Sequence, residues 1–117
     1  MILEKIGIGI DIVDINKFKK LNYKSNKNFY KKIFSDSEIE YCLKFSEPAQ
    51  HFSGKFAIKE AVVKSIKNPL PLIDIITDHF DSKPTVNINN NDDYFFKISL
   101  SHDGDYAVAI VLSEKVS

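Results

Sequence analysis

The chain opens with hydrophobic residues at every second position. In the stretch KIGIGIDIVD, isoleucine alternates with other residues from Ile6 to Ile12. Side chains of an extended strand alternate between its two faces, so the isoleucines share one face and Gly7, Gly9 and Asp11 share the other. Glycine packs no side chain and weakens a strand, so two glycines on one face indicate that a helix or a ligand approaches the backbone closely. The pattern predicts a strand with one apolar face and one nearly bare face that carries a carboxylate.

Helical spacing follows this strand. Asp14 is a suitable N-cap for a short helix over residues 15–21, and a second helical stretch is predicted near residues 28–34. Ser35 and Glu38 have the spacing of a capping box, and apolar residues recur at helical spacing after them. The sequence therefore predicts three short helices in this part of the chain.

The longest predicted helix begins at Pro48, which suits a first helical turn, and runs to about Lys67, where an Asn-Pro pair ends it. Its apolar side chains fall on one ridge when projected at about 100° per residue. The ridge comprises Phe52, Phe56, Val63 and Ile66, widened by Ile58 and Val62. Lys59 falls in the middle of the ridge, where an ammonium group needs either a route to solvent or an anionic partner.

The C-terminal half has the period of strands. Four stretches show it, namely LIDIIT, TVNINN, YFFKISLS and YAVAIVL, and the Asp-Gly pair at 103–104 predicts a tight hairpin between the last two. Ser99 and Ser101 of one strand, with Ala107 and Ala109 of the next, are expected to make another face that permits close approach. A strand, then helices, then an antiparallel meander predicts an α+β fold in which the sheet packs against the long helix.

Composition and length narrow the class of protein. A chain of 117 residues, 44% hydrophobic and 27% charged, is expected to form one globular domain over residues 1–117. No apolar run approaches the roughly 20 residues that span a bilayer, and the N-terminus lacks a signal-peptide pattern. Cys42 is the single cysteine, cannot form an internal disulfide and is expected to be a packed thiol. These features predict a cytoplasmic protein.

Charge is balanced overall but unevenly placed. The formal net charge is +0, which argues against a general nucleic-acid binder. All basic residues are lysines, and seven of them lie between Ile15 and Ser35, where there is no acidic residue. This run is either a solvated surface or a surface for an acidic macromolecular partner.

The candidate chemistry rests on a few polar residues. No cluster has the spacing of zinc ligands, no Ser-His-Asp arrangement is recognisable, and no Walker-type phosphate loop is present. Two acids remain, Asp11 and Glu60, whose hard oxygens suit magnesium. Glu60 and Lys64 are one helical turn apart, which fits either an ordinary surface pair or part of a site. His102 stands at the hairpin turn and is either a surface residue or a functional one.

Several motifs, in order along the chain, carry a resemblance to a known family. They are GIGIDIVDI, KIFSDSEIEYC, FSGKFAIKEAVVK, SKPTV and SLSHDGDYAVAIV. Together they resemble the bacterial holo-acyl-carrier-protein synthases, the short trimeric class of 4′-phosphopantetheinyl transferases. The signature Phe-x-x-Lys-Glu-Ala-x-x-Lys, from Phe56 to Lys64, is specific when it follows a Gly-x-Asp strand at about this interval.

The resemblance implies an enzyme of fatty acid biosynthesis. Such an enzyme moves the phosphopantetheine arm of coenzyme A onto a serine of apo acyl carrier protein and leaves adenosine 3′,5′-bisphosphate. Asp11 and Glu60 match the family's magnesium ligands, and Lys64 matches a lysine near the pyrophosphate, so these three would be the catalytic residues. The fold implied is that of the 4′-phosphopantetheinyl transferases, assembled as a homotrimer with clefts between subunits.

The resemblance also implies a coenzyme A site that consists of Lys55, Lys59, Lys64 and His102. Lys55 stands where the family has arginine, and His102 stands where it has a histidine near the nucleotide. Lys59 could share the work at the pyrophosphate or hold the helix against the sheet. Asp103 could support the metal or His102.

A carrier-protein surface is implied at Lys17, Lys20 and Lys24. Lys17 replaces an arginine with which the family grips the acidic helix of the carrier, so charge is kept and bidentate geometry is lost. The family's Gly-Thr-Gly after the long helix, which lies along the nucleotide, is replaced by IKNPL.

Two other functions fit parts of the pattern. A degenerate trimeric binder could hold a nucleotide or carrier protein without turnover, although it would not need Asp11, Glu60 and Lys64 together. A transferase for peptide- or polyketide-synthase carriers is usually about twice as long, so the length disfavours it.

Overall fold

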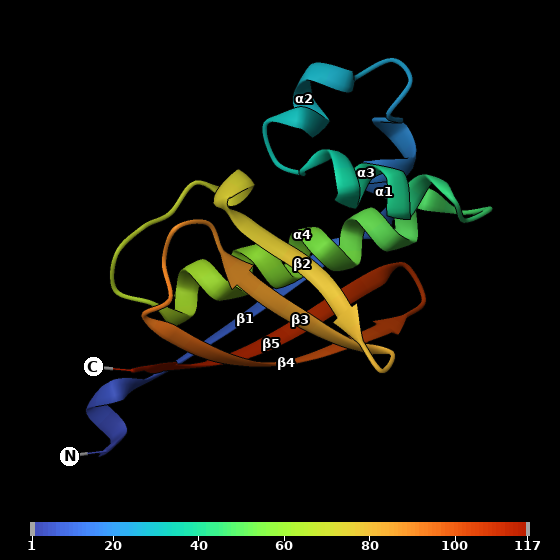
Figure 1. The fold of residues 1–117 in the computed structure, drawn as a ribbon. Helices are drawn as coiled ribbons and strands as arrows, with labels where there is room; N and C mark the ends of the chain where they lie inside the picture. Colours follow the sequence, from blue (N-terminus) through green and yellow to red (C-terminus); the bar gives the residue numbers. More distant parts are fainter. Residues whose placement is uncertain (1, 117) are drawn as a thin grey trace.

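The central element is a long helix, α4 (Pro48–Ser65), which crosses the inner face of a three-stranded antiparallel sheet (Figure 1). The computed structural model describes residues 2–116. The other helices are α1 (Ile15–Lys20), α2 (Lys27–Lys31) and α3 (Asp36–Leu43), with 3-10 turns at Ile2–Lys5 and Leu72–Asp74. The strands are β1 (Ile6–Asp14), β2 (Ile75–Phe80), β3 (Lys83–Ile88), β4 (Tyr94–Asp103) and β5 (Tyr106–Lys115). The predicted α+β class is confirmed.

The larger sheet has the strand order β1-β5-β4, so the two ends of the chain pair with each other. β4 and β5 form the predicted hairpin, and Gly104 in its turn has a φ of +57°, a conformation that favours glycine. β2 and β3 form a separate two-stranded sheet. The four C-terminal strands therefore form two antiparallel hairpins, β2–β3 and β4–β5. The sequence predicted one continuous meander, but β3 and β4 belong to different sheets.

The register of the β4–β5 hairpin decides which side chains share a face. Its two-residue turn pairs odd-numbered positions of β4 with even-numbered positions of β5, as in Ser99 opposite Ile110. Directly opposed residues point to the same side, so Ser99 and Ser101 lie on the outer face. Ala107 and Ala109 are fully buried on the inner face. The prediction that these serines and alanines form one small face is therefore wrong.

Gly7 and Gly9 mark the contact between β1 and α4. A Cβ atom on Gly7 would lie 1.7 Å from the carbonyl oxygen of Ser65, and one on Gly9 would lie 1.9 Å from that of Ala61. No side chain fits at such distances, so the bare face of β1 accommodates the backbone of α4 rather than a ligand. The order of the two contacts also shows that β1 and α4 run in opposite directions.

The isoleucine face of β1 points away from α4. Ile8, Ile10 and Ile12 are each about 60% exposed (62%, 58% and 62%), and Phe95 of β4 and Leu112 of β5 are exposed on the same face of the sheet. The strand pattern predicted from the sequence is confirmed, but its apolar face is left without a covering layer in the single chain. An exposed apolar surface of this kind is typical of a contact with another protein surface.

The short helices form a layer over the N-terminal part of α4 (Figure 1). The Asp14 carboxylate accepts a hydrogen bond from the Asn16 backbone at 3.0 Å, and Ser35 and Glu38 form the predicted capping box. Aromatic rings join this layer to α4. They are Phe18, Tyr30, Phe34 and Phe52, with centroids 4.7 Å apart for Tyr30–Phe52 and 5.1 Å for Phe34–Phe52.

Some boundaries differ from the prediction. Helix α4 starts at Pro48 as expected but ends at Ser65, because Ile66 is extended. The strand predicted from residue 72 begins only at Ile75, after a 3-10 turn. Cys42 is fully buried, and burial raises the pKa of its thiol to about 12, which confirms a packed thiol. Across residues 2–116, no helix has the length and apolar character needed to cross a bilayer.

Candidate active site

Asp11 lies on the inner face of β1, within reach of the Lys64 side chain from the last turn of α4. Lys64 donates hydrogen bonds from Nζ to the Ile10 carbonyl oxygen at 3.0 Å and to Asp11 Oδ1 at 3.1 Å. The side chains of Lys64 and Asp11 are 53% and 16% exposed, so this ion pair lies at the surface. An exposed pair contributes little to stability, which leaves Lys64 able to exchange its contact with Asp11 for one with a phosphate.

Glu60 lies one helical turn before Lys64 on α4 and is partly buried. Because β1 and α4 run in opposite directions, the step from Gly9 to Asp11 moves back along the helix by about one turn. This step brings Asp11 toward the turn that holds Glu60. Residues about fifty positions apart in the sequence therefore come from adjoining parts of β1 and α4, and Lys64, one turn after Glu60, contacts Asp11.

This donor set fits one kind of metal ion. Among the described residues there is no group of three or more His, Cys, Asp or Glu side chains arranged to hold a metal, which disfavours a closed structural site. Magnesium differs, because it is bound by one or two carboxylates and completes its shell with water and substrate phosphates. The surface position of Asp11 and Glu60 meets that requirement.

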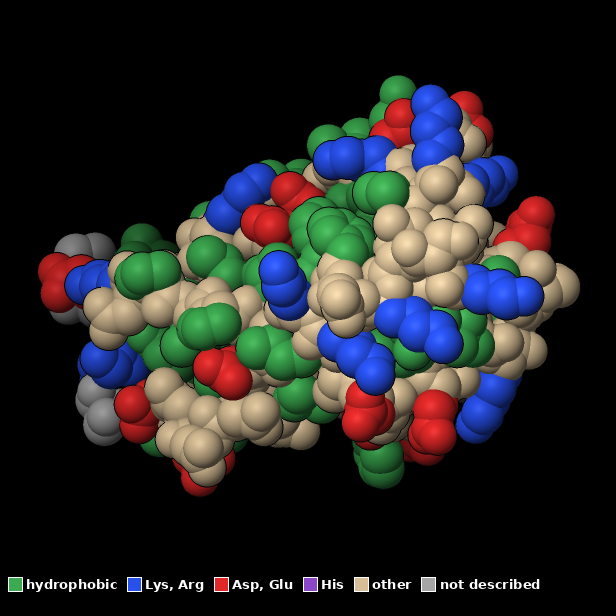
Figure 2. All heavy atoms as spheres, turned by 90° about the horizontal axis from the view of Figure 1, so that it is seen from above, with side chains coloured by type: hydrophobic (Ala, Val, Ile, Leu, Met, Phe, Trp, Pro, Cys, Tyr) green, Lys and Arg blue, Asp and Glu red, His purple; other side chains and the backbone are tan. Residues whose placement is uncertain are grey.

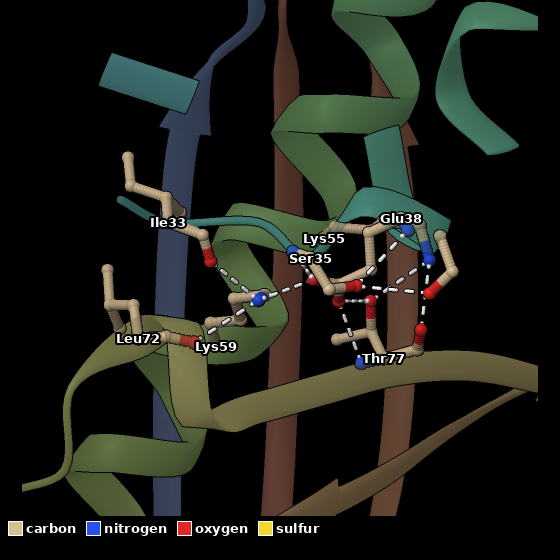
Figure 3. Close-up of polar contacts among 8 residues, drawn as sticks. Ile33, Ser35, Glu38, Lys55, Lys59, Leu72 and Thr77 are labelled. Carbon is tan, nitrogen blue, oxygen red and sulfur yellow. Dashed lines mark hydrogen bonds and ion pairs between the residues drawn. The ribbon is translucent and has the colours of Figure 1, made fainter. Parts of the chain in front are cut away.

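Lys59 is enclosed by protein acceptors (Figure 3). Its side chain is 0% exposed, and its Nζ donates to Glu38 Oε1 and to the Ile33 carbonyl oxygen, both at 2.7 Å, and to the Leu72 carbonyl oxygen at 3.2 Å. An ammonium group has three N–H donors, so all three are used within the chain. Of the two roles that the sequence left open for Lys59, these contacts support the internal one and leave no donor for coenzyme A.

Glu38 is the anionic partner of Lys59. Its carboxylate is 1% exposed and also accepts hydrogen bonds from the backbone N–H groups of Ser35 and Thr77, each at 2.8 Å. Burial alone would raise the pKa of Glu38, but the hydrogen bonds from Lys59 and Thr77 and the charge of Lys59 outweigh it and lower the pKa. The sequence indicated that Lys59 needs an anion and that Glu38 caps a helix, but nothing in it paired the two.

Lys55 lies one turn before Lys59 on α4, and its Nζ donates to Thr77 Oγ1 at 2.9 Å and weakly to the Thr77 carbonyl oxygen at 3.4 Å. The ammonium also lies 4.8 Å from the centre of the Tyr41 ring. Lys55 is only 5% exposed, and this burial lowers its pKa. It borders a small cavity of about 40 Å³. Unlike Lys59, it therefore combines internal contacts with a position at a cavity.

All three histidines of the chain border the same cavity as Lys55, namely His51, His79 and His102. His102 Nε2 lies 3.3 Å from the Gln50 carbonyl oxygen, at the end of β4. Burial, and after it the charges of the other two histidines and Lys55, lowers the pKa of His51. Burial, and after it the charge of Lys55, lowers the pKa of His79. The sequence drew attention to His102 alone, because His51 and His79 belong to no motif that sets them apart.

The lysines expected to meet a carrier protein lie on the helical layer. Lys17 and Lys20 are exposed on α1, and Lys24 is exposed in the loop after it. Figure 2 looks down on this layer and shows lysine side chains spread over it, with acidic ones between some of them. Lys24 also borders a groove of about 690 Å³ between this loop and the start of α4. Asp103 is exposed at the end of β4.

Comparisons with known proteins agree on one family. The model of the 4′-phosphopantetheinyl transferase superfamily matches residues 7–111. The chain is 38% identical over 109 residues to a holo-[acyl-carrier-protein] synthase of Thermodesulfovibrio yellowstonii, covering 91% of this chain and 96% of that protein. It is 37% identical over 121 residues to the protein of the same name from Ehrlichia ruminantium strain Gardel, covering 96% and 98%.

Solved structures give the same result. A holo-(acyl-carrier-protein) synthase of Bacillus anthracis in complex with CoA (3′,5′-ADP) superposes with a TM-score of 0.79 at 28% identity, covering 93% of this chain and 96% of that one. A holo-[acyl-carrier-protein] synthase of Helicobacter pylori in complex with coenzyme A gives a TM-score of 0.76 at 28% identity, covering 92% and 99%. The chain therefore belongs to the 4′-phosphopantetheinyl transferase superfamily and, within it, to the holo-[acyl-carrier-protein] synthases.

Proposed function

We propose that this chain transfers the 4′-phosphopantetheine arm of coenzyme A to a serine of apo acyl carrier protein at the site formed by Asp11, Glu60 and Lys64. This is the reaction of its family, and it supplies holo-carrier for fatty acid biosynthesis. The observation that carries the assignment to this site is the contact of Lys64 with Asp11, because it joins the family's two signature segments at one place on the surface.

The reaction is a phosphoryl transfer. The serine Oγ forms a bond to the phosphorus that bears the pantetheine arm, while the bond from that phosphorus to the bridging oxygen breaks. Adenosine 3′,5′-bisphosphate leaves with the electron pair of that bond. The carboxylate of either Asp11 or Glu60 accepts the serine proton. The Lys64 ammonium exchanges its contact with Asp11 for a contact with the diphosphate.

We assign the cation to Asp11 and Glu60. Asp11 and Glu60 would hold the ion with their carboxylate oxygens. A magnesium ion there would supply positive charge that stabilises the diphosphate and the leaving phosphate. Both side chains are partly buried, which restricts the positions that they can adopt.

Lys55 and His102 are assigned to the nucleotide end of coenzyme A. Both border the small cavity, and Lys55 supplies a positive charge there. Lys59 is left out of this site because its three donors are used inside the chain.

The carrier protein is assigned to the lysine-rich helical layer. Lys17, Lys20 and Lys24 are exposed. Their positive charges attract an acidic helix, and salt screens this attraction. The groove beside Lys24 gives this surface a concave place for apolar side chains. A cytoplasmic location, in keeping with a lone cysteine, is part of the same proposal.

The exposed apolar face of the sheet is assigned to a homotrimer. Ile8, Ile10 and Ile12 form a continuous row on β1, which a second and third copy would cover. Sedimentation equilibrium tests this assignment directly. A trimer is expected, and an Ile10→Glu variant should shift the protein toward the monomer; a wild-type monomer would contradict the assignment.

One assay tests the function as a whole. The protein is incubated with coenzyme A, magnesium chloride and apo acyl carrier protein, and the carrier is examined by mass spectrometry. The carrier is expected to gain the mass of the phosphopantetheine arm. Binding of coenzyme A or carrier without any mass gain would favour the alternative, a non-catalytic trimeric binder.

A further inference from the structure

The ammonium group of Lys55 is held in place beside the small cavity by hydrogen bonds within the chain. A lysine side chain has four rotatable bonds, and its charge is stabilised best by water, so a buried ammonium at a cavity needs fixed acceptors. Lys55 is 5% exposed. Its hydrogen bonds to Thr77, at 2.9 Å to Oγ1 and 3.4 Å to the carbonyl oxygen, are the ones that fix it.

The direction of the hydrogen bonds at Thr77 is determined by its neighbours. A hydroxyl group has one hydrogen to donate, and the Thr77 hydroxyl donates it to Glu38 Oε2 at 2.5 Å, because a carboxylate can only accept. The oxygen lone pairs of Thr77 therefore face Lys55. Lys55 donates to Thr77, which donates to Glu38, in a single chain of bonds (Figure 3).

Glu38 is held firmly at the end of this chain. Its Oε2 also accepts from the Thr77 backbone N–H at 2.8 Å, and its Oε1 accepts from Ser35 N and Lys59 Nζ. These contacts come from α4, from β2 and from the residue that caps α3. Every buried side-chain nitrogen and oxygen among the described residues has a hydrogen-bond partner, so this network has no loose member.

We propose that Thr77, backed by Glu38, is a positioning residue for coenzyme A, which orients the Lys55 ammonium toward the phosphate-bearing nucleotide end of the substrate. Thr77 acts through Lys55 and makes no contact of its own with the substrate. This inference rests on the proposed function, which places Lys55 at the nucleotide. It adds a determinant of coenzyme A affinity that lies on β2, outside the signature segment of α4.

Thr77→Val tests the proposal, because valine keeps the branched shape and removes the hydroxyl. Loss of a hydrogen bond to a charged group corresponds to about a tenfold change or more. The KM for coenzyme A should therefore rise about tenfold, while kcat and the KM for carrier protein change less than about threefold. Thr77→Ser keeps the hydroxyl and should restore the wild-type KM. A purely structural role would lower the melting temperature and leave the KM for coenzyme A unchanged, which would overturn the proposal.

A double-mutant cycle separates positioning from other effects. In a Lys55→Met background, Thr77→Val should have little further effect on coenzyme A affinity, because the ammonium that Thr77 positions is gone. An equal effect in both backgrounds would contradict the proposal. If Thr77→Val does not fold, Thr77→Cys replaces the hydroxyl by a weakly hydrogen-bonding thiol and should show the same rise in KM.

Calorimetric titration with coenzyme A tests the positioning role of Thr77 separately from the proposed transferase function. A wild-type protein without transferase activity would overturn the proposed function alone. Weaker binding of coenzyme A by Thr77→Val than by Thr77→Ser would still support the positioning role, and equal binding would overturn it.

Discussion

At the scale of single residues, two lysines of the same helix have opposite environments. Lys59 and Lys64 are five positions apart on α4, yet the first is 0% exposed and the second 53%. The ammonium of Lys59 completes a buried ion pair with Glu38, whereas that of Lys64 reaches a carboxylate at the surface. We infer that one lysine serves the fold and the other serves the chemistry.

Substitution by methionine should separate these roles. Lys59→Met leaves the Glu38 carboxylate buried without its cation, which typically costs about 3–5 kcal/mol of unfolding free energy. Lys64→Met, the matched control, should change stability by less than about 0.5 kcal/mol but lower transferase activity at least tenfold. Urea unfolding and a steady-state assay check both. Equal destabilisation by the two variants would contradict the distinction.

Two histidines should make stability depend on pH. The pKa values of His51 and His79 are lowered mainly by burial, so the unfolded chain takes up protons on them first as the pH falls. The unfolded state then binds more protons, and the unfolding free energy should decrease as the pH drops through about 6.5.

Chemical denaturation between pH 8 and pH 5.5 measures this effect. A variant with His51→Gln and His79→Gln should show a flatter profile than the wild type over that range. The same slope in both proteins would assign the pH dependence to other groups.

At the scale of elements, the packing of β1 on α4 could be anticipated in part. The alternation of glycine and isoleucine indicated a close approach but left a helix and a ligand as alternatives. The contacts of Gly7 and Gly9 with helix carbonyl groups decide for the helix. The pairing of Glu38 with Lys59 could not be anticipated, because it depends on how α3, α4 and β2 meet in space.

A single methyl group tests this packing. Gly9→Ala would place a Cβ atom 1.9 Å from the Ala61 carbonyl oxygen, so β1 and α4 must separate. Gly54→Ala is the matched control. Its Cβ atom would lie no closer than 3.1 Å to another atom, and that atom is a terminal carbon of the flexible Leu100 side chain. Gly9→Ala should lower the melting temperature much more than Gly54→Ala. Similar melting temperatures would show that the helix does not lie as close as described.

At the scale of the whole molecule, the sequence predicted most of the order and type of the elements. Capping residues, the proline at the start of α4 and the Asp-Gly hairpin are local signals, and each is found where predicted. The face shared by the β4 serines and the β5 alanines was predicted wrongly, because the two-residue turn sets the other register. The division into two sheets was not predicted, because it depends on contacts between distant segments. The resemblance to a family correctly supplied the fold and the reaction, which local patterns alone did not.

Asp11, on the Gly-x-Asp strand, and Glu60, in the signature segment of α4, are proposed to act together in magnesium-dependent transfer. The most direct test is the initial rate of mass gain by apo acyl carrier protein, followed against magnesium concentration for Asp11→Ala and Glu60→Ala. Glu40→Ala, on the exposed side of α3, serves as the control. Each of the first two variants should lose transfer by about a hundredfold or more, with the control unchanged. Transfer by either variant at close to the wild-type rate would contradict the claim.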